Sequence, residues 1–154
     1  MFRMNKLTDY GVVLLTRITQ QPTRGFSARE LAEGARLPLP TVGKVLKTLV
    51  RDGILVSQRG TKGGYSLARS PREITVASII SALEGPVSLT ECNLPGICEL
   101  ERGCPTRANW QLVNGAILDS LSRLTLADMM RPLSRSLFTF PIVPGASLLR
   151  SYPV

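Results

Sequence analysis

Three cysteines and the absence of histidine define the chemistry open to this chain. Cys92, Cys98 and Cys104 follow one another with five residues between each pair, and the 154-residue chain contains no histidine. That absence excludes His-based catalytic triads, His-ligated metal sites and imidazole proton shuttles. Because thiolates bind iron and zinc well, residues 92–104 are where a metal site or a reactive thiol is expected.

The even spacing of the cysteines differs from common metal-binding patterns. A zinc ribbon needs close Cys-x2-Cys pairs, and bacterial ferredoxins also space their cysteines tightly. Three thiolates on one loop, with turns formed by its prolines and glycines, could surround an iron–sulfur cluster if a fourth ligand came from elsewhere. A zinc site completed by an oxygen ligand, or three plain thiols, fits the spacing too, so these alternatives stay open.

The sequence also indicates a compartment. An odd number of cysteines argues against a disulfide framework. No stretch approaches the roughly 18 apolar residues that a membrane span needs, and residues 1–6 lead into an amphipathic segment without a signal-peptide core. We therefore expect a cytoplasmic protein without a membrane partner.

Hydrophobic periodicity and turn residues predict a winged helix-turn-helix over residues 1–72. Thr8 is a candidate N-cap for the first helix, and the capping-box pattern Ser27–Glu30 opens the second. A third helix with a basic outer face and a basic hairpin complete the motif. The expected elements are helices over 8–20, from 28 onward and from about 40 to 51, and strands over 54–59 and 65–67 around a glycine-rich turn at 60–64.

The rest of the chain is expected to add a cysteine loop and a dimerisation helix over residues 73–131, followed by an irregular or disordered tail over 132–154. Thr75 is a candidate cap for a helix over 76–84; a longer helix is expected from about 105 to 123, and a short one after Thr125. The predicted fold class is mainly α with a small β-wing. We expect the apolar stripe of the long helix to cross its symmetry mate in a homodimer, the alternative being that it packs on the first helix of the same chain. The stripe consists of Trp110, Val113, Ile117 and Leu121.

The distribution of charge favours DNA as a partner. The net charge is +8, and residues 24–72 carry ten basic residues against three acidic ones. Such a patch attracts phosphates, while the exposed face of the third helix would read base edges in the major groove. A protein-binding winged helix with solvated charges is the alternative. The candidate DNA-binding residues are Thr41, Lys44, Lys47 and Thr48 on the helix, and Arg59 and Lys62 in the wing.

Several motifs together resemble the iron–sulfur transcription repressors of the IscR and NsrR type. The wing Arg59–Tyr65 (RGTKGGY), the start Leu7–Gly11 (LTDYG) and the three evenly spaced cysteines carry this resemblance over about residues 1–130. The segments Ser88–Cys92 (SLTEC) and Cys104–Trp110 (CPTRANW) resemble most closely the subgroup that regulates SUF iron–sulfur cluster assembly.

The resemblance implies a homodimer with crossed long helices, in which each winged helix reads half of a palindromic operator. It also implies that a [4Fe-4S] or [2Fe-2S] cluster controls transcription, with Cys92, Cys98 and Cys104 as ligands. The IscR branch has a histidine ligand three residues after the third cysteine; this chain has Arg107 there, which cannot bind iron. The NsrR branch uses an aspartate at the start of the first helix of the other subunit. Asp9 matches that position and is our first choice for the fourth ligand, ahead of Glu91, Glu99 and Glu101.

The function expected is that of a transcriptional repressor that senses cluster supply or redox stress, with the SUF genes as targets. An enzyme is not expected, because the chain has neither a nucleophile–base pair nor a phosphate loop. An electron carrier would have no use for a helix-turn-helix. A DNA-binding protein stapled by zinc, or controlled by thiols without a cluster, is the remaining alternative.

Overall fold

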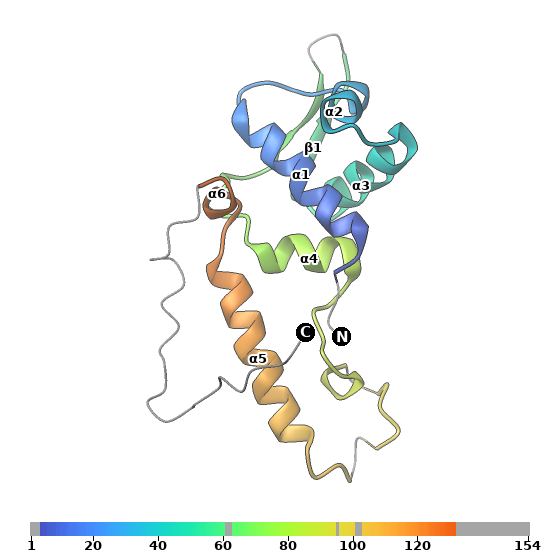
Figure 1. The fold of residues 1–154 in the computed structure, drawn as a ribbon, viewed down its shortest axis with the longest axis vertical. Coiled ribbons are helices and arrows are strands. Elements are labelled where there is room, and N and C mark those ends of the chain that lie inside the picture. Colours follow the sequence, from blue (N-terminus) through green and yellow to red (C-terminus); the bar gives the residue numbers. More distant parts are fainter. Residues whose placement is uncertain (1–3, 61–62, 95, 101–102, 132–154) are drawn as a thin grey trace, which may run out of the picture.

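The computed structural model describes residues 4–60, 63–94, 96–100 and 103–131 (Figure 1). This part of the chain is mainly helical with one two-stranded antiparallel sheet, which confirms the predicted fold class. The predicted tail over 132–154 lies outside it. The elements are helices α1 (Lys6–Gln20), α2 (Ala28–Ala35) and α3 (Leu39–Arg51), strands β1 (Leu55–Gln58) and β2 (Gly64–Leu67), helix α4 (Val76–Glu84), the short 3-10 helix η1 (Glu91–Asn93), and helices α5 (Arg107–Arg123) and α6 (Leu126–Met129).

The helix starts follow from local capping. Ser27 accepts a hydrogen bond from the Glu30 N–H while the Glu30 carboxylate accepts one from the Ser27 N–H, so the predicted capping box is present. Thr75 caps α4, as expected. The prediction that Thr8 caps the first helix is wrong: α1 begins two residues earlier, with Asn5 as its N-cap. Thr8 is fully buried inside the helix instead.

The wing packs against the segment that precedes α2. Strands β1 and β2 pair from Leu55 opposite Leu67 to Gln58 opposite Gly64. Phe26 forms an isolated bridge with Tyr65, with backbone hydrogen bonds of 3.0 and 2.8 Å. Gly64 has a φ of +136°, and a Cβ atom there would lie 2.7 Å from the Phe26 carbonyl oxygen. The glycine is therefore required where the two backbones meet.

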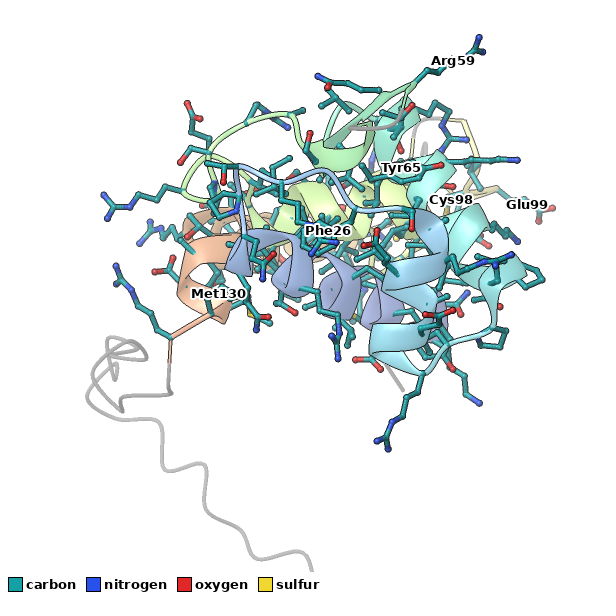
Figure 2. The ribbon with its side chains drawn as sticks, turned by 90° about the horizontal axis from the view of Figure 1, so that it is seen from above. Phe26, Arg59, Tyr65, Cys98, Glu99 and Met130 are labelled. Atoms are coloured by element: carbon teal, nitrogen blue, oxygen red, sulfur yellow. The ribbon has the colours of Figure 1, made fainter. Side chains whose placement is uncertain are left out.

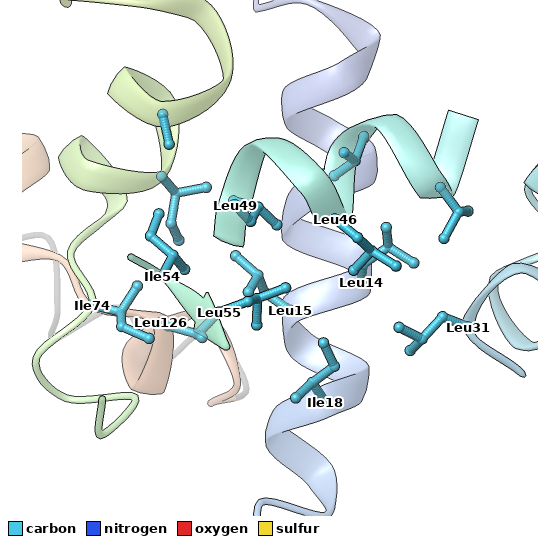
Figure 3. Packing of buried hydrophobic residues seen from close by; sticks show 14 of the residues in the cluster. Leu14, Leu15, Ile18, Leu31, Leu46, Leu49, Ile54, Leu55, Ile74 and Leu126 are labelled. Atoms are coloured by element: carbon cyan, nitrogen blue, oxygen red, sulfur yellow. The ribbon is translucent and has the colours of Figure 1, made fainter. Parts of the chain in front are cut away.

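One hydrophobic core joins the N-terminal helices to the C-terminal end of the described chain (Figure 3). Leu14, Leu15 and Ile18 of α1 are fully buried in it. Leu126 of α6 belongs to the same core. Two backbone hydrogen bonds of 2.8 Å hold its segment beside the start of α4: Leu126 N–H donates to the Ile74 carbonyl, and Val76 N–H donates to the Leu124 carbonyl. Residues on both sides of the predicted boundary at 72/73 thus share one core.

Helix α5 extends away from this core, and its N-terminal end lies farthest from it (Figure 1). A second, smaller cluster joins the base of α5 to α4, where Leu118, Leu121 and Leu124 pack on Val76, Ile80 and Val87. Within the described residues, no helix combines the length and the hydropathy that crossing a membrane requires.

Candidate nucleic-acid interface and cysteine segment

Helix α3 presents a basic face opposite its buried face. Four of its apolar residues are in the core, and Lys44 and Lys47 are exposed on the other side. Thr41 and Thr48 are only half-buried and lie at the edge of the exposed face. Lys47, expected on the flank, is therefore more accessible than Thr48. The buried residues are Val42, Val45, Leu46 and Leu49.

Arg59 extends this basic surface into the wing. It is exposed directly after β1, and its side chain projects away from the body of the molecule (Figure 2). Lys62, the other predicted wing residue, lies outside the described residues. A long cation at the tip of a wing is suited to a phosphate or to the minor groove beside the recognition helix.

Two other arginines near this surface are held by acidic neighbours. Arg24 forms an ion pair with Glu30 and lies 4.8 Å from the centre of the Phe26 ring. The Arg51 guanidinium donates to both carboxylate oxygens of Asp52 at 3.2 Å. The hydrogen bonds from Asp52 raise the pKa of Arg51 above its ordinary value. Lys44, Lys47 and Arg59 have no such ion pair among the described residues, so their charges are available to an external anion.

The cysteine segment lies between α4 and α5. Cys92 is in η1, although its side chain lies outside the described part of the structure. Cys98 and Cys104 are half-buried free thiols. Cys104 Sγ is 3.3 Å from the Thr106 hydroxyl. Hydrogen bonds from the Thr106 side chain and then its backbone lower the pKa of Cys104, which favours the thiolate that binds metals.

Asn114 ties α5 to the start of this segment. Its side chain is almost fully buried, accepts a hydrogen bond from Leu89 N–H at 3.1 Å and donates one to the Val87 carbonyl at 3.3 Å. A buried amide with both ends bonded fixes the segment three residues before Cys92. Asn114 was not among the residues predicted from the sequence, although its place beside an apolar stripe was a usable signal.

The Glu84 side chain connects the C-terminal end of α4 to α1. Its carboxylate accepts hydrogen bonds from Asn5 N–H at 2.8 Å and from the Thr8 hydroxyl at 2.5 Å. Glu84 is the last residue of α4, and the cysteine segment begins immediately after it. We call this arrangement the Glu84 clamp. It connects the entrance of the cysteine segment to the first turn of α1, which also carries Asp9.

The described part of this single chain does not assemble a complete metal site. No three Cys, Asp or Glu side chains within it are close enough together to hold a metal ion. Asp9 is exposed on α1 and is not brought into such a group with Cys98 and Cys104. Glu91 and Glu99 are exposed as well, and Glu101 lies outside the described residues.

The predicted dimerisation stripe divides into two parts. Trp110 and Val113 are 43% and 41% exposed, and Ile117 is half-buried. Leu121 packs against the α4 cluster of its own chain. The part of α5 farther from the core thus carries large apolar side chains that the described chain leaves accessible to a partner.

The comparisons with known proteins point to one family. The Rrf2 family, iron-dependent transcriptional regulators, matches residues 4–132. A putative HTH-type transcriptional regulator of Synechocystis is 33% identical over 82% of this chain and 86% of its own. Two solved structures are similar: CymR, the global cysteine regulator of B. subtilis (TM-score 0.66, 26% identity, 84% of this chain and 97% of that one), and T. potens IscR (TM-score 0.62, 27% identity, 89% and 97%).

Proposed function

Because the chain belongs to the Rrf2 family of transcriptional regulators and is not an enzyme, we propose that it is a repressor controlled by an iron–sulfur cluster. In this proposal a homodimer binds a palindromic operator in the cytoplasm, with α3 in the major groove and the wing beside it. The observation that carries the proposal is the attachment of the start of the cysteine segment both to α1, through Glu84, and to α5, through Asn114.

The chemistry of the donor set fits an iron–sulfur cluster. Cys98 and Cys104 are accessible thiols, and the lowered pKa of Cys104 favours the thiolate form. Cys92, Cys98 and Cys104 would hold a [4Fe-4S] or [2Fe-2S] cluster, which supplies negative charge and a cross-link between distant parts of the loop. The exposed carboxylate of Asp9 from the partner subunit is the proposed fourth ligand, since in its own chain Asp9 is not grouped with the cysteines.

A cluster held in this way would act on DNA binding through the two attachments. A cluster bound by the cysteines would change the position of α5 through Asn114, and α5 carries the proposed dimer contact. Because two half-sites demand a fixed distance between two α3 helices, a change in the angle between α5 helices changes the affinity for the operator. The Glu84 clamp transmits the same change to α1, which packs directly on α3.

The proposed targets are genes for SUF iron–sulfur cluster assembly. The support comes from the resemblance of Ser88–Cys92 and Cys104–Trp110 to SUF regulators. The family description as iron-dependent and the similarity to T. potens IscR are consistent with a regulator of iron chemistry.

One specific observation favours a second function, control by thiols without a cluster. CymR is similar to this chain over most of its length, and the accessible Cys104 thiol has a lowered pKa, which makes a thiol more reactive at neutral pH. In this alternative, oxidation or zinc binding at the same cysteines would alter the loop.

Anaerobic purification distinguishes these functions. We expect a brown protein with iron and sulfide in equal amounts, and colourless protein from each of Cys92→Ala, Cys98→Ala and Cys104→Ala. Asp9→Ala should retain a cluster that is lost faster in air, whereas Glu33→Ala, the matched control with an exposed carboxylate outside the candidate ligands, should behave as wild type. A colourless wild-type protein with stoichiometric zinc, or with no metal, would refute the cluster and leave the alternative.

The homodimer is tested by sedimentation. Ile117→Asp places a charge in the accessible apolar stripe and should give a monomer that binds DNA poorly. Ser122→Asp, on an exposed face of the same helix, is the control and should remain dimeric. A monomeric wild-type protein would refute this part of the proposal.

A further inference from the structure

The glycines inside the helices differ in what surrounds them. Glycine destabilises a helix interior relative to alanine, so each such position calls for a reason. A Cβ atom at Gly11 would collide with Leu83 Cδ1, so that glycine allows α4 to pack on α1. A Cβ atom at Gly34 would lie 2.8 Å from a guanidinium nitrogen of Arg17.

Gly43 has no such reason within the described chain. Apart from its chain neighbours and the backbone of its own helix, a Cβ atom there would meet no described atom within 4 Å. The position is one turn from Lys47 and next to Lys44, both of which are exposed. The residue one turn earlier, Leu39, is exposed too. Gly43, itself half-buried, therefore leaves a gap at the edge of the basic face of α3 that no described side chain fills.

We propose that duplex DNA fills this gap, so that Gly43 sets the depth at which α3 enters the major groove. An α-helix with side chains is about 10–12 Å across, and the major groove is about 12 Å wide. A helix that nearly fills the groove can move closer to the base edges only where a side chain is missing. Glycine is the residue that permits such close approach of a backbone to a ligand.

The assignment rests on the proposed function, namely DNA recognition by α3, and adds a residue that determines specificity without contacting DNA through a side chain. With the backbone at Gly43 close to the bases, Lys44 and Lys47, which both follow Gly43 around the same side of the helix, are within reach of phosphates or base edges.

The test measures thermal stability and operator affinity, which a substitution of Gly43 should change in opposite directions. Gly43→Ala should raise Tm by about 2–4 °C, because alanine favours the helix, yet weaken operator binding about tenfold. Gly43→Leu should also fold stably and bind more weakly still. Gly115→Ala is the matched control, since Gly115 is a helical glycine of α5 whose Cβ position is equally free of described atoms. It should raise Tm by a similar amount with wild-type affinity.

The probe is a duplex of about 30 base pairs that the wild-type protein selects from a random-sequence pool, with affinity measured by fluorescence anisotropy at several salt concentrations. A steric loss should persist at every salt concentration, because no phosphate contact is removed. Unchanged or tighter binding by Gly43→Ala would overturn the assignment. A lower Tm for Gly43→Ala, or an equal loss of affinity in Gly115→Ala, would overturn it as well. If the wild-type protein selects no duplex, the proposed DNA recognition itself fails.

Discussion

The Glu84 clamp gives a prediction whose size follows from its geometry. Thr8 is fully buried and its hydroxyl donates to the Glu84 carboxylate, which also accepts from Asn5 N–H. Hydrogen bonds to a charged acceptor contribute about 1.5–3 kcal/mol each, and Glu84 is exposed, so the lower end applies. We expect Thr8→Val to lower the free energy of unfolding by about 1.5 kcal/mol. Glu84→Ala removes both bonds but should lower it by only about 2 kcal/mol, because water can replace the carboxylate at the N–H of the exposed Asn5.

The double variant should cost about 2 kcal/mol rather than the sum, because Thr8→Val removes nothing further once Glu84 is absent. Urea unfolding at one fixed protein concentration measures all three variants, and the largest loss corresponds to a fall in Tm of about 6 °C. Glu84→Gln keeps an acceptor oxygen and is the control, with a smaller effect. Additive effects of the two single variants would refute the clamp, since they would show that the two side chains are not coupled.

Three further predictions concern DNA binding, the shared core and pH. Lys44→Ala and Arg59→Ala should each weaken operator binding by about 1–3 kcal/mol without a change in Tm. Fluorescence anisotropy across salt concentrations measures the affinity. Wild-type affinity in both variants would contradict the proposed placement of α3 and the wing on DNA. Leu126→Ala should lower the free energy of unfolding by about 3 kcal/mol, because the side chain is fully buried. Met129→Ala, in the same helix but 48% exposed, should lower it by under about 1 kcal/mol. Equal urea midpoints for the two variants would contradict the shared core. The hydrogen bonds from the Ser27 backbone and hydroxyl lower the pKa of Glu30, so its capping contribution is present at neutral pH and lost as the pH falls through that lowered pKa. Glu30→Gln should therefore be less stable than wild type at pH 7 and converge with it in acid, and a gap that persists in acid would contradict this.

Features fixed by neighbouring residues could be predicted from the sequence. The capping box at Ser27 and the cap at Thr75 depend on residues three positions away, and both are present. The start of α1 was predicted wrongly because Asn5 and Thr8 are both good N-cap residues. In the folded chain both residues also donate hydrogen bonds to Glu84, which is 76 residues from Thr8, and a contact over that distance does not follow from the local pattern.

The site was harder to predict for the same reason. The exposed lysines of α3 follow from helical periodicity, but the burial of Thr48 and the exposure of Lys47 depend on how α3 lies against its neighbours. In α5, periodicity predicts an apolar stripe but does not tell which of its residues contact α4 of the same chain and which are left for a partner. Leu121 contacts the α4 cluster. Asn114 bonds residues 25 and 27 positions away, a distance at which one sequence carries little signal.

The most direct test of the proposed function is the operator affinity of the same protein with and without its cluster. Anaerobically purified protein, the same protein stripped with a chelator under reducing conditions, and a variant with all three cysteines replaced by alanine are compared by fluorescence anisotropy. The proposal predicts that the cluster changes the affinity of the wild-type protein by about tenfold or more, within the usual range of coupling between sites, while the variant gives one affinity and stays dimeric. Equal affinities for the loaded and stripped wild-type protein would contradict control by the cysteine segment.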